Sequence, residues 1–370
     1  MRRLLIRALV IVSVLAASVH ADETGGSRLS TLLGSGEDAG FVKAIAAREF
    51  EFPRDHGPHP EYRNEWWYVT GNLDDESGRR FGFELTVFRF ALTPEAQDAG
   101  WRSNQVYIAH LAVTDAEDER FFVAERFSRG ALGLAGARAE PFRVWIDDWH
   151  IGSEDAGGPW RLYAADDEVS IDVALRPLRK PALNGLDGLS QKSAETGNAS
   201  YYYSITRLDT AGELRIGDDS YTVSGLAWMD REWSSSALSP DQAGWDWFAL
   251  QLSDGSDLMF YNIRKTDGRQ DAHSAGTWVS EEGSVEHIAR EDIEIIVEER
   301  WQSPAGGSYP SRWSLHLPGK NLRLTITPVI DDQELFTTVR YWEGAVDING
   351  ERGDLPVTGR GYVELTGYAE

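Results

Sequence analysis

Short segments in which apolar and polar residues alternate run along most of this chain. From residue 49 onward, segments rich in aromatic and β-branched residues, such as 80–90, 105–113, 245–252 and 293–301, recur between turns rich in Gly, Asp and Asn. Their period of two residues is typical of strands, whereas the 3.6-residue period of an amphipathic helix is nearly absent. The pattern therefore predicts an all-β protein made of barrels or sandwiches.

One hairpin pattern occurs twice, about one domain apart. Residues 66–89 contain a Trp-x-Tyr pair, an acidic turn with glycine and a strand ending at an arginine, and residues 245–264 repeat this order with a Trp-x-Trp pair. A duplicated barrel is the simplest explanation, and chance similarity of two hairpins is the alternative. A Pro- and Gly-rich stretch at 177–197 is either a connection between domains or a long loop. We expect domains at 49–215 and 216–370.

The N-terminus has the pattern of a secretory signal peptide. Arginines at the start are followed by an apolar stretch at 8–17 and by small residues up to Ala21. This predicts cleavage after Ala21 and a periplasmic or secreted protein. A membrane anchor is the alternative, but the apolar stretch is shorter than the roughly 20 residues of a membrane span. Residues 22–48 are expected to be a flexible lead-in with a short helix at 40–48.

Charge and cysteine content narrow the function classes. The chain has 36 Lys and Arg against 60 Asp and Glu, a net charge of −24, which disfavours nucleic acid and anionic lipid surfaces as partners. It has no Cys, which excludes thiol catalysis and Cys metal sites. His56 and His59 could bind a metal, but the intervening Gly-Pro turn need not bring their rings together. We therefore predict neither a metal nor another cofactor.

Four long, aromatic-rich segments carry a resemblance to a known family. They are FPRDHGPHPEYRNEWWYVTG (52–71), GLAWMDREWSSS (225–236), GWDWFALQLSDGSDLMFYNIR (244–264) and YWEGAVDINGERGDLPVTGRGYVELTGY (341–368). The chain resembles the hydroxyneurosporene synthase, or carotenoid hydratase, family and its AttH-like lipocalin relatives. The resemblance implies two tandem lipocalin-like antiparallel β-barrels and a hydrophobic small-molecule ligand, such as a lipid or isoprenoid. Its AttH-like branch also implies export and association with ABC-type transporter components.

The hydration chemistry of the hydratase branch indicates which residues to consider. Adding water to an unactivated alkene needs a proton donor, a positioned water and a dry pocket that tolerates a carbocation. A carboxyl group among aromatic rings suits this task, since burial raises its pKa and ring faces attract positive charge. The candidate catalytic residues are Asp230, Glu232, Asp246 and Tyr261. The candidate ligand-binding residues are His56, Glu65, Trp66, Tyr68, His110, Trp233, Trp245, Trp247, Trp342 and Glu343.

Arg231 is a departure from the hydratase branch, in which the resemblance implies a histidine at this place. Arginine is a poor proton shuttle, which weakens the hydratase interpretation; the alternative is that Arg231 pairs with carboxylates to close a barrel end. Three functions stay open. They are an exported protein that binds a hydrophobic small molecule, a hydratase-type enzyme, and a non-catalytic partner in an envelope complex. The absence of a pocket above about 300 Å³ would favour the last.

Overall fold

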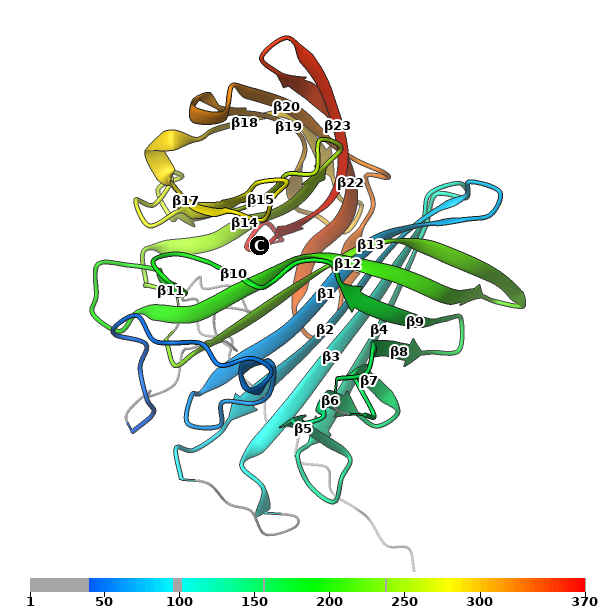
Figure 1. Cartoon of the computed structure of the whole chain (residues 1–370), viewed down its shortest axis with the longest axis vertical. Coiled ribbons are helices and arrows are strands. Elements are labelled where there is room, and N and C mark those ends of the chain that lie inside the picture. Colours follow the sequence, from blue (N-terminus) through cyan, green and yellow to red (C-terminus); the bar gives the residue numbers. More distant parts are fainter. Residues whose placement is uncertain (1–39, 96–101, 156, 237, 370) are drawn as a thin grey trace, which may run out of the picture.

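The protein is built from antiparallel strands in two curved sheets (Figure 1). The computed structural model describes residues 40–95, 102–155, 157–236 and 238–369. In Figure 1 the second sheet curls almost into a closed barrel, and the first is a more open half-barrel. The predicted all-β class with tandem lipocalin-like barrels is confirmed. The expected signal peptide at 1–21 lies outside the described residues.

The first sheet has 13 strands, in the order β4-β3-β2-β1-β13-β12-β9-β8-β7-β6-β5, with β10 and β11 paired to β12. Its strands are β1 (Asn64–Asp75), β2 (Arg80–Ala91), β3 (Gln105–Asp115), β4 (Arg120–Arg129), β5 (Ala135–Ala139), β6 (Phe142–Ile146), β7 (Trp149–Gly152), β8 (Trp160–Ala165), β9 (Val169–Pro177), β10 (Ala182–Leu183), β11 (Leu189–Gln191), β12 (Ala199–Ile216) and β13 (Asp219–Ser234). A short 3-10 helix, η1 (Arg54–His56), precedes β1.

The second sheet has ten strands, in the order β17-β16-β15-β14-β23-β22-β20-β19-β18, with β21 paired to β22. Its strands are β14 (Gln242–Leu252), β15 (Asp257–Lys265), β16 (Ala275–Val279), β17 (Val285–Ala289), β18 (Glu294–Gln302), β19 (Ser308–Leu317), β20 (Leu322–Pro328), β21 (Glu334–Phe336), β22 (Arg340–Arg352) and β23 (Leu355–Leu365). Two short 3-10 helices, η3 (Arg290–Asp292) and η4 (Pro318–Lys320), connect its strands.

The chain passes from one sheet to the other between Ser234 and Gln242. The expected division at 215/216 falls inside the β12–β13 hairpin, and both strands of that hairpin belong to the first sheet. The repeated hairpins at 66–89 and 245–264 occupy equivalent places. β1 lies between β2 and β13, the last strand of its sheet, and β14 lies between β15 and β23, the last strand of the other.

The lead-in does not form the helix expected at 40–48, and that prediction is wrong. The segment has no helical hydrogen bonds and packs against the first barrel. Ala44 is fully buried in the core of that barrel, and the N–H of Val42 donates to the carbonyl of Glu61. These contacts replace the hydrogen bonds that a helix would have made. None of the described residues belongs to a helix long and apolar enough to cross a membrane.

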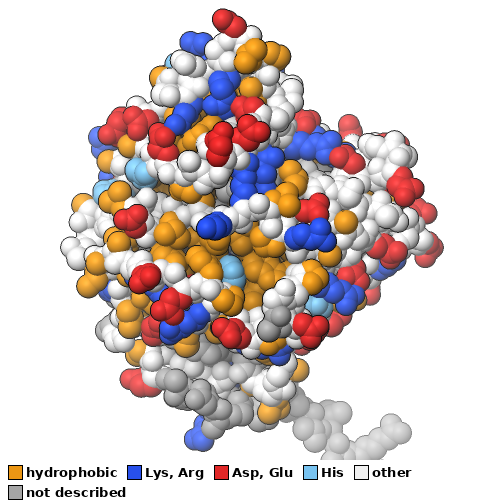
Figure 2. All heavy atoms as spheres, viewed as in Figure 1, with side chains coloured by type: hydrophobic (Ala, Val, Ile, Leu, Met, Phe, Trp, Pro, Cys, Tyr) orange, Lys and Arg blue, Asp and Glu red, His pale blue; other side chains and the backbone are white. Residues whose placement is uncertain are grey.

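Strand alternation gives each sheet two buried faces. In β1, Trp67 and Val69 point into the core of the first barrel, whereas Tyr68 between them points toward the second sheet. Trp247 of β14 likewise points toward the first sheet, while Phe248 belongs to the core of the second barrel. A separate aromatic cluster therefore lies between the two sheets. On the outside, Figure 2 shows acidic side chains scattered over the visible face rather than gathered in one patch.

Candidate functional site

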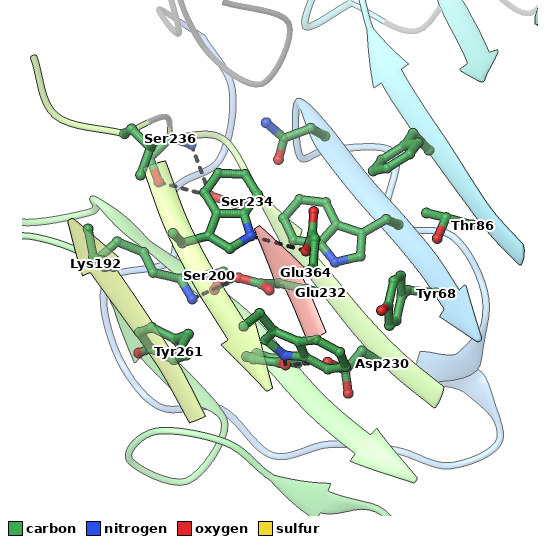
Figure 3. A pocket seen from close by; sticks show the side chains of 18 of the residues that line it. Tyr68, Thr86, Lys192, Ser200, Asp230, Glu232, Ser234, Ser236, Tyr261 and Glu364 are labelled. Atoms are coloured by element: carbon green, nitrogen blue, oxygen red, sulfur yellow. Dashed lines mark hydrogen bonds and ion pairs between the residues drawn. The ribbon is translucent and has the colours of Figure 1, made fainter. Parts of the chain in front are cut away.

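A cavity lies between the two sheets, within this interdomain aromatic cluster (Figure 3). Its volume is about 130 Å³. This is below the range of about 300–1,000 Å³ that is usual for small-molecule sites. Side chains that line it include Trp66, Tyr68, Thr86, Phe88, Lys192, Ser200, Tyr202, Asp230, Glu232, Trp245, Trp247, Tyr261, Tyr341, Glu343 and Glu364.

Asp230 of β13 is held in this wall by three hydrogen bonds from the first sheet, one of which connects it to the second. Its Oδ1 accepts from the Ser204 hydroxyl at 2.5 Å and from Trp228 Nε1 at 2.7 Å. Its Oδ2 bonds to the Tyr202 hydroxyl, which accepts from Trp247 Nε1 of the second sheet at 3.0 Å. Burial raises the pKa of Asp230 to about 7, although these donors act in the opposite direction. Asp230 can therefore gain or lose a proton near neutral pH.

Glu364 of β23 approaches the cavity from the second sheet. Its Oε2 accepts from Trp245 Nε1 at 3.0 Å. The side chain keeps some accessible surface although it lies between the sheets, because it faces the cavity (Figure 3). Burial raises the pKa of Glu364 to about 7, and the nearby charges of Glu232 and Asp230 add to this effect. A second carboxyl group is thus ready to exchange a proton at the cavity wall.

Lys192 and Glu232 form an ion pair at one end of the cavity. Lys192 Nζ lies 3.1 Å from Glu232 Oε1, which also accepts from the Ser200 hydroxyl. The same ammonium lies 4.1 Å from the ring centroid of Tyr261, whose hydroxyl is 2.9 Å from the Ser190 hydroxyl. Burial would lower the pKa of Lys192, but Glu232 and Tyr261 outweigh it and raise the pKa. Lys192 is therefore charged inside the protein.

Glu343 and Glu84 are buried side by side at another part of the interface. Burial raises the pKa of Glu343 well above its usual range, and Glu84 and Glu364 reinforce the effect. Burial also raises the pKa of Glu84 to about 8. Five buried oxygen atoms here have no hydrogen-bond partner among the described residues. They are both carboxyl oxygens of Glu84, Oε1 of Glu343 and the hydroxyl oxygens of Tyr68 and Thr86. These two carboxyl groups are therefore held protonated at neutral pH.

Comparison with known proteins places the chain in a family. The AttH-like family model matches residues 43–368. The chain belongs to the AttH-like family. This AttH-like chain is similar to the crystal structure of a protein described as an AttH from Nitrosomonas europaea, with 32% identity and a TM-score of 0.81 over 89% of this chain and 100% of that one. The family recognised from the four motifs is thereby confirmed.

More distant structures share the AttH-like fold. Kievitone hydratase from Nectria haematococca has 16% identity and a TM-score of 0.68, over 89% of this chain and 98% of that one. CghA, crystallised with Sch210972, has 11% identity and a TM-score of 0.50, over 90% of this chain and 98% of that one. At these identities the likeness shows the fold alone. A search of curated protein sequences finds no significant match.

Many residues predicted from the sequence do meet at the cavity of the AttH-like chain. Those that line it are Trp66, Tyr68, Asp230, Glu232, Trp245, Trp247, Tyr261 and Glu343. Sequence reasoning missed Lys192, Tyr202, Tyr341 and Glu364, which line it too. The alternation in the last strand, GYVEL, places Tyr362 and Glu364 on the same face, and this signal could have indicated Glu364 as a candidate. Lys192 follows the short strand β11 in an irregular stretch, where no local pattern indicates its direction.

Asp246 and Trp342 lie away from the cavity, contrary to expectation. Asp246 sits on the opposite face of β14 from Trp245 and Trp247, because neighbouring residues of a strand point to opposite sides. Its carboxylate accepts from Arg264 Nε and from the Tyr368 hydroxyl, each at 2.9 Å. Trp342 is buried in the core of the second barrel. Both residues hold that barrel together.

Glu65 and Arg231 belong to a buried charge network at one end of the first barrel. Glu65 Oε2 lies 3.1 Å from Arg231 Nη2, and Glu65 Oε1 lies 2.5 Å from Arg89 Nε. Burial alone would raise the pKa of Glu65, but Arg89, His59 and Arg231 hold it well below its usual range. Arg231 points away from the cavity, since Asp230 and Glu232 flank it on the other face of β13. The side chain of Arg231 is therefore not part of the cavity wall.

The other three predicted residues also make structural contacts. His56 Nδ1 lies 2.6 Å from the Tyr203 hydroxyl, and burial lowers the pKa of His56 to about 4. Trp233 stacks on the His59 ring, with 3.7 Å between centroids. His110 faces the second sheet, where its Nδ1 lies 2.7 Å from the Tyr341 hydroxyl. His110 thus links the sheets behind Tyr341, and the other two close the barrel end.

Proposed function

We propose that this protein is an acid–base enzyme of the hydratase type, which adds water to a carbon–carbon double bond of an apolar small molecule bound between the two sheets. One observation carries the proposal. Two carboxyl groups with near-neutral pKa values, Glu364 and Asp230, meet a cavity lined by indole rings. A carrier of an apolar molecule needs only apolar walls, and burying carboxyl groups without ion pairs is unfavourable. Shifted pKa values in a cavity are typical of catalytic sites.

The chemistry divides between the two carboxyl groups. Protonated Glu364 gives its proton to one alkene carbon, so that a C–H bond forms while the π bond breaks and the other carbon becomes cationic. The rings of Trp66, Trp245 and Trp247 stabilise that charge. A water molecule then bonds to the cation and loses a proton to ionised Asp230. The substrate gains one H and one OH, and proton transfer between the carboxyl groups restores the starting state.

The kievitone hydratase structure supports the reaction class, because its fold is the same and its name states a hydration. Its identity to this chain is low, so the substrate itself is not carried over. The cavity lining, in which carboxyl groups lie among indole rings, supports a ligand site over a purely structural partner in an envelope complex. A binding protein without turnover is the competing function, and the experiment below separates the two.

The test is conversion in ¹⁸O-labelled water. Purified protein is incubated with kievitone and with a panel of isoprenoid alkenes, and products are analysed by mass spectrometry. We expect a product that has gained one labelled water, with a bell-shaped pH dependence of the rate centred near pH 7. Glu364→Gln and Asp230→Asn should each lower the rate by about 10²–10⁴-fold. Glu84→Gln, equally buried but behind the cavity wall, should retain it.

Two outcomes would contradict the proposal. If the wild type binds a compound stoichiometrically but converts none of the panel, the protein is a carrier. If Glu364→Gln and Asp230→Asn convert substrate as fast as the wild type, the assignment of the acid and base is wrong.

We also propose that the protein is exported, with cleavage after Ala21, and acts in the periplasm or outside the cell in association with ABC-type transporter components. The pattern of residues 1–21 supports export. N-terminal sequencing of protein purified from the cell envelope should begin at Asp22. An intact N-terminus in the cytosolic fraction would refute it.

A further inference from the structure

The cavity wall carries more acid than base. Four carboxyl side chains line it, and Lys192 is the single cation among the described lining residues. The charge of Lys192 is matched by Glu232 at 3.1 Å. Asp230, Glu343 and Glu364 form no ion pair with any described residue. Because Glu343 is held protonated, Asp230 and Glu364 are the wall carboxyl groups whose negative charge, on ionisation, no described cation would balance.

Several buried polar atoms in the same wall have no hydrogen-bond partner among the described residues. Glu343 is 1% exposed, and its Oε1 has no hydrogen-bond partner among the described residues. The hydroxyls of Tyr68 and Thr86, also buried and lining the cavity, have none either. Buried polar atoms are almost always satisfied in folded proteins. A ligand with hydrogen-bond donors would satisfy Glu343.

The aromatic part of the wall already holds one ammonium group. Lys192 Nζ lies 4.1 Å from the ring centroid of Tyr261 and 5.3 Å from that of Tyr202. Trp66, Trp245 and Trp247 line the remainder of the cavity. Indole faces attract cations more strongly than phenol faces do, and the attraction grows when water is excluded. The cavity thus combines carboxyl groups with ring faces, as sites for organic cations do.

We propose that this cavity binds an apolar molecule that carries a protonated amine or a quaternary ammonium group, in preference to the uncharged molecule of the same shape. The inference rests on the same cavity as the proposed function and names the chemical class of its ligand. An amine also places a stable positive charge where alkene protonation would create a transient one. Apolar amines should therefore act as ligands and as inhibitors of hydration.

Binding of a cation would be linked to the loss of a proton. The titratable groups close to Glu364 are Asp230, Glu232, Glu84, Glu343, Tyr68 and Tyr341. Lys192 lies on the same wall and pairs with Glu232. Of the carboxyl groups without an ion pair, Asp230 and Glu364 have the lowest pKa values, about 7. If one of them must ionise, the binding-competent fraction rises from about 1% at pH 5 to about 90% at pH 8, so affinity should increase roughly 90-fold over this range.

The test is isothermal titration calorimetry with octylammonium and 1-octanol, which have the same chain length but differ in charge. At pH 8 we expect octylammonium to bind at least about tenfold more tightly than 1-octanol. At pH 7, titrations in two buffers with different ionisation enthalpies should show proton release with octylammonium and none with 1-octanol. Affinity for octylammonium should fall toward pH 5, while that for 1-octanol should not change.

Variants test whether the carboxyl groups of the cavity wall cause the pH-dependent binding of octylammonium. Glu364→Gln should flatten the pH dependence for octylammonium and leave 1-octanol binding intact. Asp230→Asn provides a second variant if the first fails to fold, and Glu84→Gln is the control. Equal affinity for the two probes, or a pH-independent affinity for octylammonium, would overturn the inference. Labelled-water turnover without amine preference would overturn this inference alone, whereas amine preference without turnover would overturn only the proposed reaction.

Discussion

Replacing Arg231 by methionine tests whether this residue stabilises the fold or takes part in the reaction. The guanidinium is fully buried and donates to the carbonyls of Gly57 at 2.6 Å and Trp66 at 2.7 Å, and to Glu65 Oε2 at 3.1 Å. It also lies 4.0 Å from the ring centroid of Trp67. Methionine fills much of the same volume but donates no hydrogen bond. Arg231→Met therefore removes the side-chain donor to two carbonyls and one of the donors to Glu65 Oε2, which keeps the backbone N–H of His59 at 3.1 Å.

The expected loss follows from these contacts. Removing one partner of a buried ion pair costs about 3–5 kcal/mol, and Glu65 still keeps Arg89, which favours the lower part of this range. At roughly 2–4 °C per kcal/mol for a domain of this size, the thermal midpoint should fall by about 6–20 °C. The cavity faces the other side of β13, so the rate of hydration by the remaining folded protein should not change.

The assay is urea and thermal unfolding followed by tryptophan fluorescence. Arg360→Met is the matched control, because Arg360 pairs with Asp74 on the half-exposed surface, where such pairs contribute at most about 1 kcal/mol. A loss below about 1 kcal/mol for Arg231→Met, equal to that of the control, would refute the structural role. If the variant has normal stability but no longer catalyses the reaction, Arg231 takes part in the chemistry.

Two further predictions concern the interface. The folded pKa values of Asp230 and Glu364 lie above the ordinary value, so the folded state holds extra protons and its stability should fall as pH rises from about 4 to about 7. Asp230→Asn should therefore have a higher thermal midpoint than the wild type at pH 8 but not at pH 4. The same difference in midpoint between variant and wild type at both pH values would contradict this. An ideal Cβ at Gly82 would lie 2.7 Å from Ala345 Cβ of the other sheet. Gly82→Leu should therefore lower the free energy of unfolding, measured in urea, by about 1–3 kcal/mol. An unchanged midpoint would mean that the sheets are not in close contact there.

Much of the fold could be predicted from the sequence because strand alternation and the two similar hairpins are local signals. The point at which the chain passes from the first sheet to the second could not be predicted. Gly217, between the long strands β12 and β13, is compatible with a linker as well as with a hairpin turn. Pairing across the whole sheet decides between the two. The expected helix at 40–48 failed for a similar reason, because contacts with the barrel override local preference.

The site could be predicted in part. Alternation correctly separates Asp230 from Arg231, but both faces of β13 are buried near its end, so hydrophobicity does not reveal which face meets the other sheet. Trp233 of β13, like Asp246 of β14, instead lies on the inner face of its barrel. Only the docking of the two sheets shows that Glu364 lies near Asp230, more than 130 residues away in the chain.

The position of the cavity has a consequence for how activity arises during folding. Its walls come from β1, β2, β12 and β13 on one side and from β14, β15, β22 and β23 on the other. β23 is the last strand of the chain, and it carries Glu364. A growing or partly folded chain therefore cannot present the complete set of acids and indoles to any substrate. The proposed reaction would therefore require β23 to be in place, so the onset of activity would report that the two sheets have docked.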